Sequence, residues 1–414
     1  MRILVYGINF APEPIGIGKY TGEMAAWLAQ QGHEVRVVTA PPYYPGWKMA
    51  EGRSTAWYAQ ERLGAMRVWR SPLYVPAVPS GLKRLLHLAS FAVTSLPLLL
   101  RQLLWRPQVV WTVAPALFCA PGALLVSGLC GAKSWLHIQD FEVDAAFNLG
   151  MLKGKRAYSM ASGVERLCMR RFSVLSTISG RMQALAEKKR LSPGDVVLFP
   201  NWVDLAAVSV LDRLSPGPAA YRAQLGLGPE AVVALYSGNM GAKQGLELLA
   251  QAAKACPAVA FVFCGAGSGK AGLVEQCGAL KNVQFLDLQP AERLSDLLNM
   301  ADIHLLPQRA DASDLVMPSK LTGMLASGRP VVTTAHTGTE LAQVVMQTGL
   351  VVEPGDPEAF ANAIRILAQD QSLRSSLGRQ ARAYAESSLA QTAILRRFEG
   401  ALKALMPTAS SKEP

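Results

Sequence analysis

The chain has 414 residues, of which 50% are hydrophobic and 17% charged, and its 41 Lys and Arg outnumber its 30 Asp and Glu to give a net charge of +11. This length predicts two or three domains, and the apolar composition excludes a disordered chain. The six cysteines form no C-x-x-C pair, which favours reduced thiols over a disulfide framework or a zinc site. The positive charge leaves three partners open: nucleic acid, an anionic membrane or an acidic small substrate.

Strand and helix patterns alternate along the first half of the chain. A strand is predicted in RILVYGI (residues 2–8), then a helix over residues 20–31 and a strand in EVRVVTA (34–40). Four more strands are predicted in VVWTVA, SWLHIQ, VLSTIS and VVLFPN. Because parallel neighbours need crossover connections, this order predicts a parallel sheet with helices on both faces. The N-terminus shows no small-residue cleavage site, so no secretory signal is expected.

A second series of strands follows a polar stretch rich in Pro and Gly. Its six members are VVALYSG, VAFVFCG, VQFLDL, DIHLLPQ, PVVTT and LVVEPG. The sequence therefore predicts an α/β protein with two doubly wound, Rossmann-like domains facing each other across a cleft, and ligands beyond the carboxyl ends of the strands. We expect these domains at residues 1–204 and 205–385, followed by a C-terminal helix and tail at 386–414.

The apolar region between residues 80 and 133 raises the question of a membrane span. Residues 108–132 carry no charge, but Pro115, Pro121 and Gly122 favour a buried strand–helix–strand unit over a spanning helix. Residues 81–107 are different, because four cations flank their apolar residues. Two interpretations stay open for this segment: a helix lying in a headgroup interface, and a hydrophobic helix packed on its own sheet.

Two glycine-bearing loops precede predicted helices. The first contains Gly16 and Gly18, and the second, SGNMGAKQG, contains Gly238, Asn239, Lys243 and Gln244 among further glycines. Backbone amides at a helix start, together with a cation, suit a diphosphate. A tight turn is the alternative for the first loop.

The chain resembles the family 4 glycosyltransferases of the GT-B fold over nearly its whole length. The resemblance rests on the order and spacing of QGHEVRVVT, FPNWVD, SGNMGAKQG, MPSKLTGMLASGRPVVTT and GLVVEPGDPEAFANAI. Within the family, APPYYPGW and HIQDFEVDAAF are similar to colanic acid and exopolysaccharide fucosyltransferases. The resemblance implies a retaining transferase that moves a sugar onto a polyprenyl-diphosphate-linked saccharide. Fucose from GDP-fucose is the first candidate for the donated sugar, and UDP-linked sugars are the next candidates. It implies no metal, no other cofactor, and a cytoplasmic enzyme peripheral on the anionic inner membrane.

The resemblance also implies roles for individual residues, assigned position by position. The catalytic candidates are His137, Asp140 and Asp314. The donor-binding candidates are Gly16, Gly18, Gly238, Asn239, Lys243, Gln244, Ser319 and Lys320, and the acceptor-binding candidates are Tyr43, Tyr44, Trp47 and Glu142. For His137 and for the three aromatic residues, packing in a core is the alternative, and for Asp314 it is an exposed loop.

This chain departs from the family pattern at two places. Asn239 and Gln244 stand where the family usually has Arg and Lys, so Lys243 is expected to contribute more of the positive charge at the diphosphate. Gly323 stands where a Glu contacts the ribose, and Asp311 or Asp314 approximates the sugar contact.

Two other functions compete with glycosyl transfer. One is a GT-B sugar-nucleotide 2-epimerase, which needs no lipid acceptor. The other is a non-catalytic protein that binds an anionic ligand. Nucleic acid is not expected as that ligand, because the sequence contains no recognised nucleic-acid module.

Overall fold

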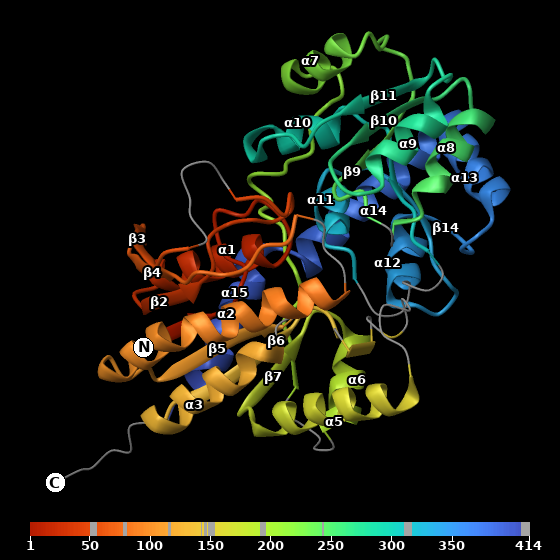
Figure 1. Cartoon of the computed structure of the whole chain (residues 1–414). Helices are drawn as coiled ribbons and strands as arrows, with labels where there is room; N and C mark the ends of the chain where they lie inside the picture. The colour runs from red at the N-terminus through yellow and green to blue at the C-terminus, as the bar shows by residue number, and fades with distance from the viewer. Residues whose placement is uncertain are drawn as a thin grey trace. The chain divides into compact units, whose positions relative to one another are not determined.

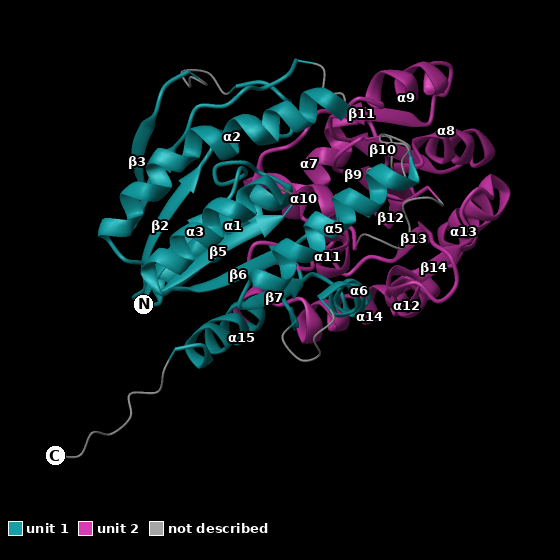
Figure 2. Cartoon of the chain, turned by 60° about the horizontal axis from the view of Figure 1, so that its bottom comes forward, with its two compact units in different colours: residues 1–200, 393–414 teal, residues 201–392 magenta. Residues whose placement is uncertain are grey.

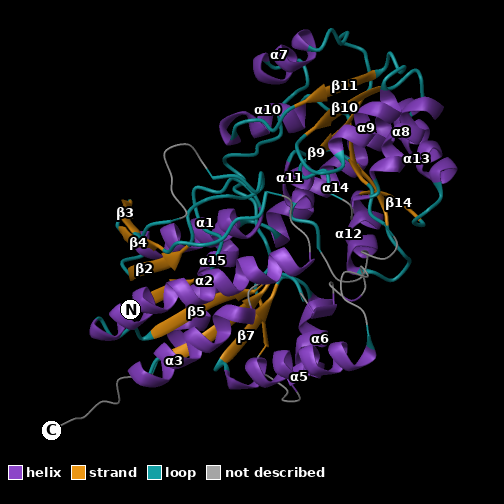
Figure 3. Cartoon of the chain, viewed as in Figure 1, coloured by secondary structure: helices purple, strands orange, loops and turns teal. Residues whose placement is uncertain are grey.

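The computed structural model describes residues 1–49, 56–77, 81–114, 117–141, 143–144, 147, 154–190, 196–241, 244–309 and 317–406. Two compact units divide the chain: unit 1 combines residues 1–200 with 393–414, and unit 2 holds residues 201–392 (Figure 2). In each unit, helices and strands alternate along the chain (Figure 3). The predicted α/β class with two Rossmann-like sheets is confirmed, and the division falls four residues before the predicted end of the first domain.

Unit 1 contains an eight-stranded sheet in the order β3-β4-β2-β1-β5-β6-β7-β8, in which only β3 and β4 pair in the antiparallel direction. The strands are β1 (Arg2–Tyr6), β2 (Glu34–Thr39), β3 (Ala59–Leu63), β4 (Met66–Arg70), β5 (Val109–Ala114), β6 (Lys133–Ile138), β7 (Val174–Thr177) and β8 (Val196–Leu198). The predicted strand–helix–strand unit is present as β5, α3 and β6. The hairpin of β3 and β4 was not predicted.

The helices of unit 1 lie on both faces of its sheet. They are α1 (Gly16–Gln30), α2 (Gly81–Arg101), η1 (Gln102–Leu104), η2 (Leu117–Cys119), α3 (Ala120–Cys130), α5 (Lys155–Arg171), α6 (Gly180–Arg190) and α15 (Gln391–Ala404). The crossovers through α2, α3, α5 and α6 all advance toward β8, whereas α1 connects β1 backward to β2. Because such crossovers are right-handed, α1 lies on the face opposite α2, α3, α5 and α6.

Unit 2 contains a six-stranded, fully parallel sheet in the order β11-β10-β9-β12-β13-β14. Its strands are β9 (Val233–Ser237), β10 (Ala260–Cys264), β11 (Val283–Leu286), β12 (Ile303–Leu306), β13 (Val331–Thr334) and β14 (Gly349–Val352), so all six predicted strands are present. Its helices are α7 (Pro216–Gln224), α8 (Leu246–Ala255), α9 (Lys270–Cys277), η4 (Ala291–Arg293), α10 (Leu294–Asn299), α11 (Lys320–Ala326), α12 (Glu340–Thr348), α13 (Pro357–Gln369) and α14 (Gln371–Ser388) (Figure 1).

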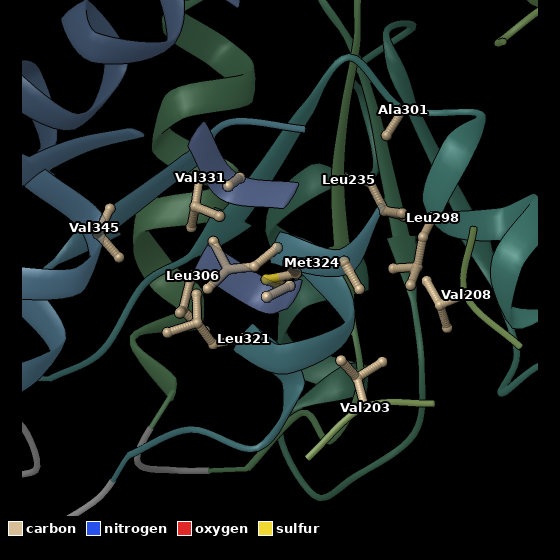
Figure 4. Close-up of a cluster of buried hydrophobic side chains, with 14 of the residues drawn as sticks. Val203, Val208, Leu235, Leu298, Ala301, Leu306, Leu321, Met324, Val331 and Val345 are labelled. Carbon is tan, nitrogen blue, oxygen red and sulfur yellow. The ribbon is translucent and has the colours of Figure 1, made fainter. Parts of the chain in front are cut away.

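The short helix α11 is held by the hydrophobic core of unit 2. Leu321 and Met324 are buried in one cluster with Leu306 of β12 and Val331 of β13 (Figure 4). Removing these side chains from water fixes both the position and the rotation of α11. Lys320, the first residue of this helix, is thereby fixed relative to the ends of the strands.

The last helix, α15, packs in unit 1, although the chain reaches it only after unit 2. The Phe398 ring stacks on Phe199 with 4.2 Å between centroids and meets Trp135 edge-on at 5.0 Å. His33 Nε2 lies 3.1 Å from Glu399 Oε1. The core of unit 1 therefore depends on a segment that follows unit 2 in the sequence.

We predict that Phe398→Ala lowers the free energy of unfolding by about 3–5 kcal/mol, because it leaves a cavity between two aromatic rings. Arg397→Ala, at an exposed neighbouring position, is the control and should change it by less than about 0.5 kcal/mol. Urea unfolding followed by tryptophan fluorescence measures both variants. Equal stability of the two would contradict the packing of α15 described here.

Candidate functional site

The order of the strands locates a ligand-binding edge in each sheet. In unit 2, the chain leaves β9 toward β10 on one side, and β12 pairs with β9 on the other side. In unit 1, β1 likewise lies between β2 and β5. Helices on opposite faces separate at such a switch point, which opens a crevice beyond the carboxyl ends of the strands. The loops after β9 and β1 are therefore the expected ligand-binding segments.

In unit 2, the loop after β9 is joined to the loop after β10 by backbone contacts. Gly238 N donates to Cys264 O at 2.9 Å, and Met240 N donates to Ala266 O at the same distance. A Cβ on Gly265, whose φ is +150°, would lie 1.9 Å from Gly238 O. Only glycine allows this approach, so Gly265 holds the glycine-rich loop in place.

Lys320 lies against this loop with neutral partners. Its Nζ donates to Tyr236 Oη at 2.9 Å and to Gln244 Oε1 at 2.8 Å, and it lies 4.2 Å from the centre of the Tyr236 ring. Burial lowers the pKa of Lys320 from 10.5 to about 7. Among the described residues, no carboxylate forms an ion pair with this ammonium group. An anionic ligand can therefore supply an opposite charge that the described residues do not.

The structure brings five of the predicted donor-binding residues together. Gly238, Asn239 and Gln244 belong to the loop after β9, and Ser319 and Lys320 begin α11. Asn239 is held through its carbonyl oxygen, which accepts a hydrogen bond from Tyr236 Oη at 2.6 Å. Lys243 and Asp314 lie outside the described residues, as does Asp311. Gly323 is part of α11.

A hollow of about 550 Å³ lies beside this loop, within unit 2. It is lined by Glu247, Leu248, Gln251, Gln308, Arg309, Gly355 and Pro357. Gln308 follows β12, and its Oε1 is buried with no hydrogen-bond partner among the described residues. A Cβ on Gly245 would lie 3.4 Å from the Gln308 carbonyl carbon, so the hollow adjoins the glycine-rich loop.

In unit 1, the loop after β1 is organised by a buried carboxyl group that the sequence analysis did not select. Asn9 Nδ2 donates to both oxygens of Glu13 at 3.3 and 3.0 Å, and the amides of Tyr43 and Tyr44 donate to Oε1 at 3.3 and 3.2 Å. Burial raises the pKa of Glu13 to about 7, although these hydrogen bonds oppose the shift. Glu13 thus ties the loop after β1 to the loop after β2.

The two glycines predicted to approach a phosphate have defined neighbours here. A Cβ on Gly18 would lie 2.4 Å from Glu13 Oε2, so the close approach that Gly18 allows is to the Glu13 side chain. Gly16 is the first residue of α1 and has a φ of +64°, and a Cβ there would lie 3.6 Å from the Tyr44 ring. These glycines make room for the Glu13 network.

The aromatic residues after β2 pack against α2. The Tyr43 ring lies 4.7 Å from His87 and 5.5 Å from Trp47, between ring centroids. Tyr43 is buried, whereas Tyr44 and Trp47 keep part of their surface. The Arg84 guanidinium lies 5.5 Å from the Trp47 ring. Tyr43 therefore packs under the loop, whereas Tyr44 and Trp47 are partly exposed.

His137 is the next-to-last residue of β6. Its side chain is only 2% exposed and stands within β6, where Nδ1 lies 2.9 Å from Ser176 Oγ. Its ring packs 5.7 Å from Trp111 and 5.1 Å from Phe199, and burial lowers its pKa to about 3. The alternative interpretation, a packed and neutral core histidine, describes this position.

Asp140 lies two residues beyond the end of β6 and is half-buried. Glu142 lies outside the described residues. The segment after β6 is anchored by Asp144, which pairs with Lys189 together with Glu165 and accepts a hydrogen bond from Tyr158 Oη at 2.8 Å. Among the described residues, no three His, Cys, Asp or Glu side chains gather as metal ligands would.

Sequence reasoning missed Glu13, Tyr236 and Gly265, and each had a partial signal. Gly265 is the last residue of the predicted strand VAFVFCG and begins the run GAGSG. Tyr236 lies within a strand, where an aromatic residue indicates only a core position. Glu13 stands between two prolines in an otherwise apolar loop, which could have marked it as unusual.

Comparison with known proteins gives two profile matches, to the glycosyl transferase 4-like domain over residues 16–202 and to the glycosyl transferases group 1 over residues 219–384. A protein of Escherichia coli (strain K12), named as a colanic acid biosynthesis glycosyl transferase, WcaI, is 45% identical over 408 residues, covering 96% of this chain and 98% of its own length.

Two solved structures share the fold. Sucrose-phosphate synthase from Thermosynechococcus elongatus superimposes with a TM-score of 0.77 at 18% identity, over 98% of this chain and 99% of the other. Anabaena HepE in complex with UDP-glucose gives 0.71 at 14% identity, over 98% and 100%.

We predict that Glu13 makes stability depend on pH between its usual pKa of 4.5 and its raised pKa of about 7. Because the folded state holds the proton more tightly, the free energy of unfolding falls as pH rises through this window, by roughly 3 kcal/mol relative to Glu13→Gln. Thermal unfolding of both proteins across this range measures the difference. Glu23→Gln, on the surface of α1, is the control. A difference between Glu13→Gln and the unmodified chain that stays constant with pH would contradict the prediction.

Proposed function

The chain belongs to the family 4 glycosyltransferases of the GT-B fold, and from this membership we propose that it transfers a sugar from a nucleoside diphosphate to a lipid-linked saccharide. The observation that carries the proposal is Lys320, a cation with neutral partners beside a glycine-rich loop. The Gln244 side-chain amide meets the Lys320 ammonium group, and the Asn239 carbonyl accepts from Tyr236, the other partner of Lys320. The departing diphosphate is the anion that this arrangement stabilises.

The finer identity of the reaction rests on resemblance. We propose transfer with retention of configuration and name GDP-fucose as the first donor to test, with UDP-linked sugars next. The likeness to WcaI supports a place in the assembly of an exopolysaccharide such as colanic acid, on a polyprenyl-diphosphate-linked acceptor. Free thiols at all six cysteines agree with a cytoplasmic enzyme.

Each unit has its own proposed role. In unit 2, Lys320, Gln244 and the amides of the loop after β9 bind the diphosphate. In unit 1, Tyr44 and Trp47 contact the acceptor sugar, and the carboxylate of Asp140 accepts the proton of the attacking hydroxyl. Glu13 is a positioning residue, because its hydrogen bonds hold the loop that carries Tyr44.

We predict that Lys320→Met weakens binding of the donor by about 10- to 100-fold, because one charge-assisted hydrogen bond to a phosphate oxygen is lost. Lys254→Met, at an exposed position on α8, is the control and should bind the donor as the unmodified chain does. Isothermal titration with GDP-fucose, GDP-mannose, UDP-glucose and UDP-N-acetylglucosamine identifies the donor and then measures each variant. If Lys320→Met binds it with unchanged affinity, the proposed diphosphate site is wrong.

Donor binding should also depend on pH. Because Lys320 has a pKa of about 7 without ligand and a diphosphate favours its charged form, affinity is expected to fall as pH rises above about 7. Lys320 then takes up a proton when the donor binds. Isothermal titration in buffers of different ionisation enthalpy detects this uptake as a change in the observed binding enthalpy. Lys320→Met should lose this dependence.

The epimerase alternative is tested separately, since an epimer formed from a UDP-N-acetylhexosamine without acceptor would replace transfer as the function.

A further inference from the structure

Helix α2 carries apolar side chains on its outer side. Leu82, Leu86, Val93 and Leu100 are all exposed, and they recur at the helical spacing that defines one stripe. Leu82 and Val93 are each 71% exposed, and Leu104 in the following turn η1 is 90% exposed. A core helix of a water-soluble domain would direct these residues inward. The stripe therefore requires a partner.

The opposite side of α2 is fixed to the sheet by specific contacts. Phe91 stacks on Tyr6 of β1 with 5.7 Å between centroids, and Ser95 Oγ lies 2.8 Å from Tyr6 Oη. Within the described residues, Gly81–Leu104 is the one helix long and apolar enough to cross a membrane, but only a third of its most apolar window is buried. Because these contacts belong to the core of unit 1, α2 lies on a surface rather than spanning a bilayer.

The neighbouring helices on the same face of the sheet continue this apolar surface. Gly122 of α3 packs so closely on α2 that a Cβ there would lie 2.9 Å from a Leu99 methyl group. On α3, Leu125 and Leu129 are exposed, one turn apart. On α5, Met160, Val164 and Leu167 form a third exposed stripe. We call the exposed stripes of α2, α3 and α5 the apolar face.

The charges around the apolar face have one sign. From residue 81 to residue 139 the sequence contains no Asp or Glu, and it contains Lys83, Arg84, Arg101, Arg106 and Lys133. Helix α5 adds five cations, and its single acid, Glu165, is buried against Lys189. Exposed apolar side chains combined with cations, on helices whose single acid is buried, are complementary to anionic headgroups over hydrocarbon.

We propose that the apolar face binds the surface of a bilayer that contains anionic phospholipid, with α2 lying in the headgroup layer. This inference deepens the proposed function, on which it rests for the lipid-linked acceptor. The inner side of α2 carries His87 and Arg84, which contact the Tyr43 and Trp47 rings of the acceptor loop. The helix that contacts the lipid thus also supports the loop that contacts the acceptor.

Sedimentation of the full chain with vesicles tests the inference without donor or acceptor. We expect binding to vesicles of phosphatidylglycerol and phosphatidylcholine, much weaker binding to phosphatidylcholine alone, and loss of binding at high salt. Val93→Asp and Arg101→Glu should each weaken binding about tenfold. Met346→Asp, at an exposed apolar position on α12, is the matched control and should bind as the unmodified chain does. Circular dichroism and donor binding verify that each variant is folded.

Three results would overturn the inference. One is a folded chain that binds the donor but does not bind anionic vesicles; this result would not contradict the proposed function. Another is vesicle binding that Val93→Asp and Met346→Asp weaken equally. The third is a lipid-free dimer that Val93→Asp dissociates, because a second copy of the chain would then cover the apolar face. Vesicle binding without any donor binding would instead count against the proposed function alone.

Discussion

Lys320 is a partly buried cation whose described hydrogen-bond partners, Tyr236 and Gln244, are both neutral. Burying an ammonium group without an opposite charge costs free energy, and the protein tolerates this because α11 is held in the core by Leu321 and Met324. The loop after β9 must then stay close enough for Gln244 to accept from Nζ. Gly265 fixes that loop through its contact with Gly238. Among the described residues, this edge of unit 2 therefore places no carboxylate against the Lys320 ammonium group.

Unit 1 also contains a buried ionisable group, the carboxyl group of Glu13, which holds two loops in position. Glu13 receives hydrogen bonds from the loop after β1 and from the loop after β2, and Arg70 adds bonds from its guanidinium to Ala11 O and Ala40 O, each at 2.7 Å. The same two loops are thus joined twice. A loop held by four or more such bonds loses little entropy when a ligand arrives, which favours binding.

The sequence was most informative where strands are buried on both faces. Strands such as β9 and β10 appear as continuous apolar runs, because helices cover both sides of a parallel sheet. Strand β3, with the sequence AQERL, is largely exposed at the edge and lacks such a run. The two interpretations of His137 stayed open for a related reason: in a fully buried strand, the apolar pattern does not show which polar side chain is buried. Two partners of Glu13, the amides of Tyr43 and Tyr44, lie 30 and 31 residues away, so only the fold could reveal its burial.

Unit 2 is an insertion within unit 1, since the chain leaves unit 1 after residue 200 and returns to it at residue 393. Close to these two crossings, Val203 N donates to Leu389 O at 2.9 Å, and Gln391 N donates to Val203 O at 3.1 Å. Backbone hydrogen bonds thus join the segment that enters unit 2 to the segment that leaves it. Because its two ends are adjacent, unit 2 has the topology of a self-contained module. Unit 1, in contrast, is complete only after the ribosome has synthesised all of unit 2 and then residues 393–414. During translation, unit 2 can therefore fold before unit 1 has its last helix.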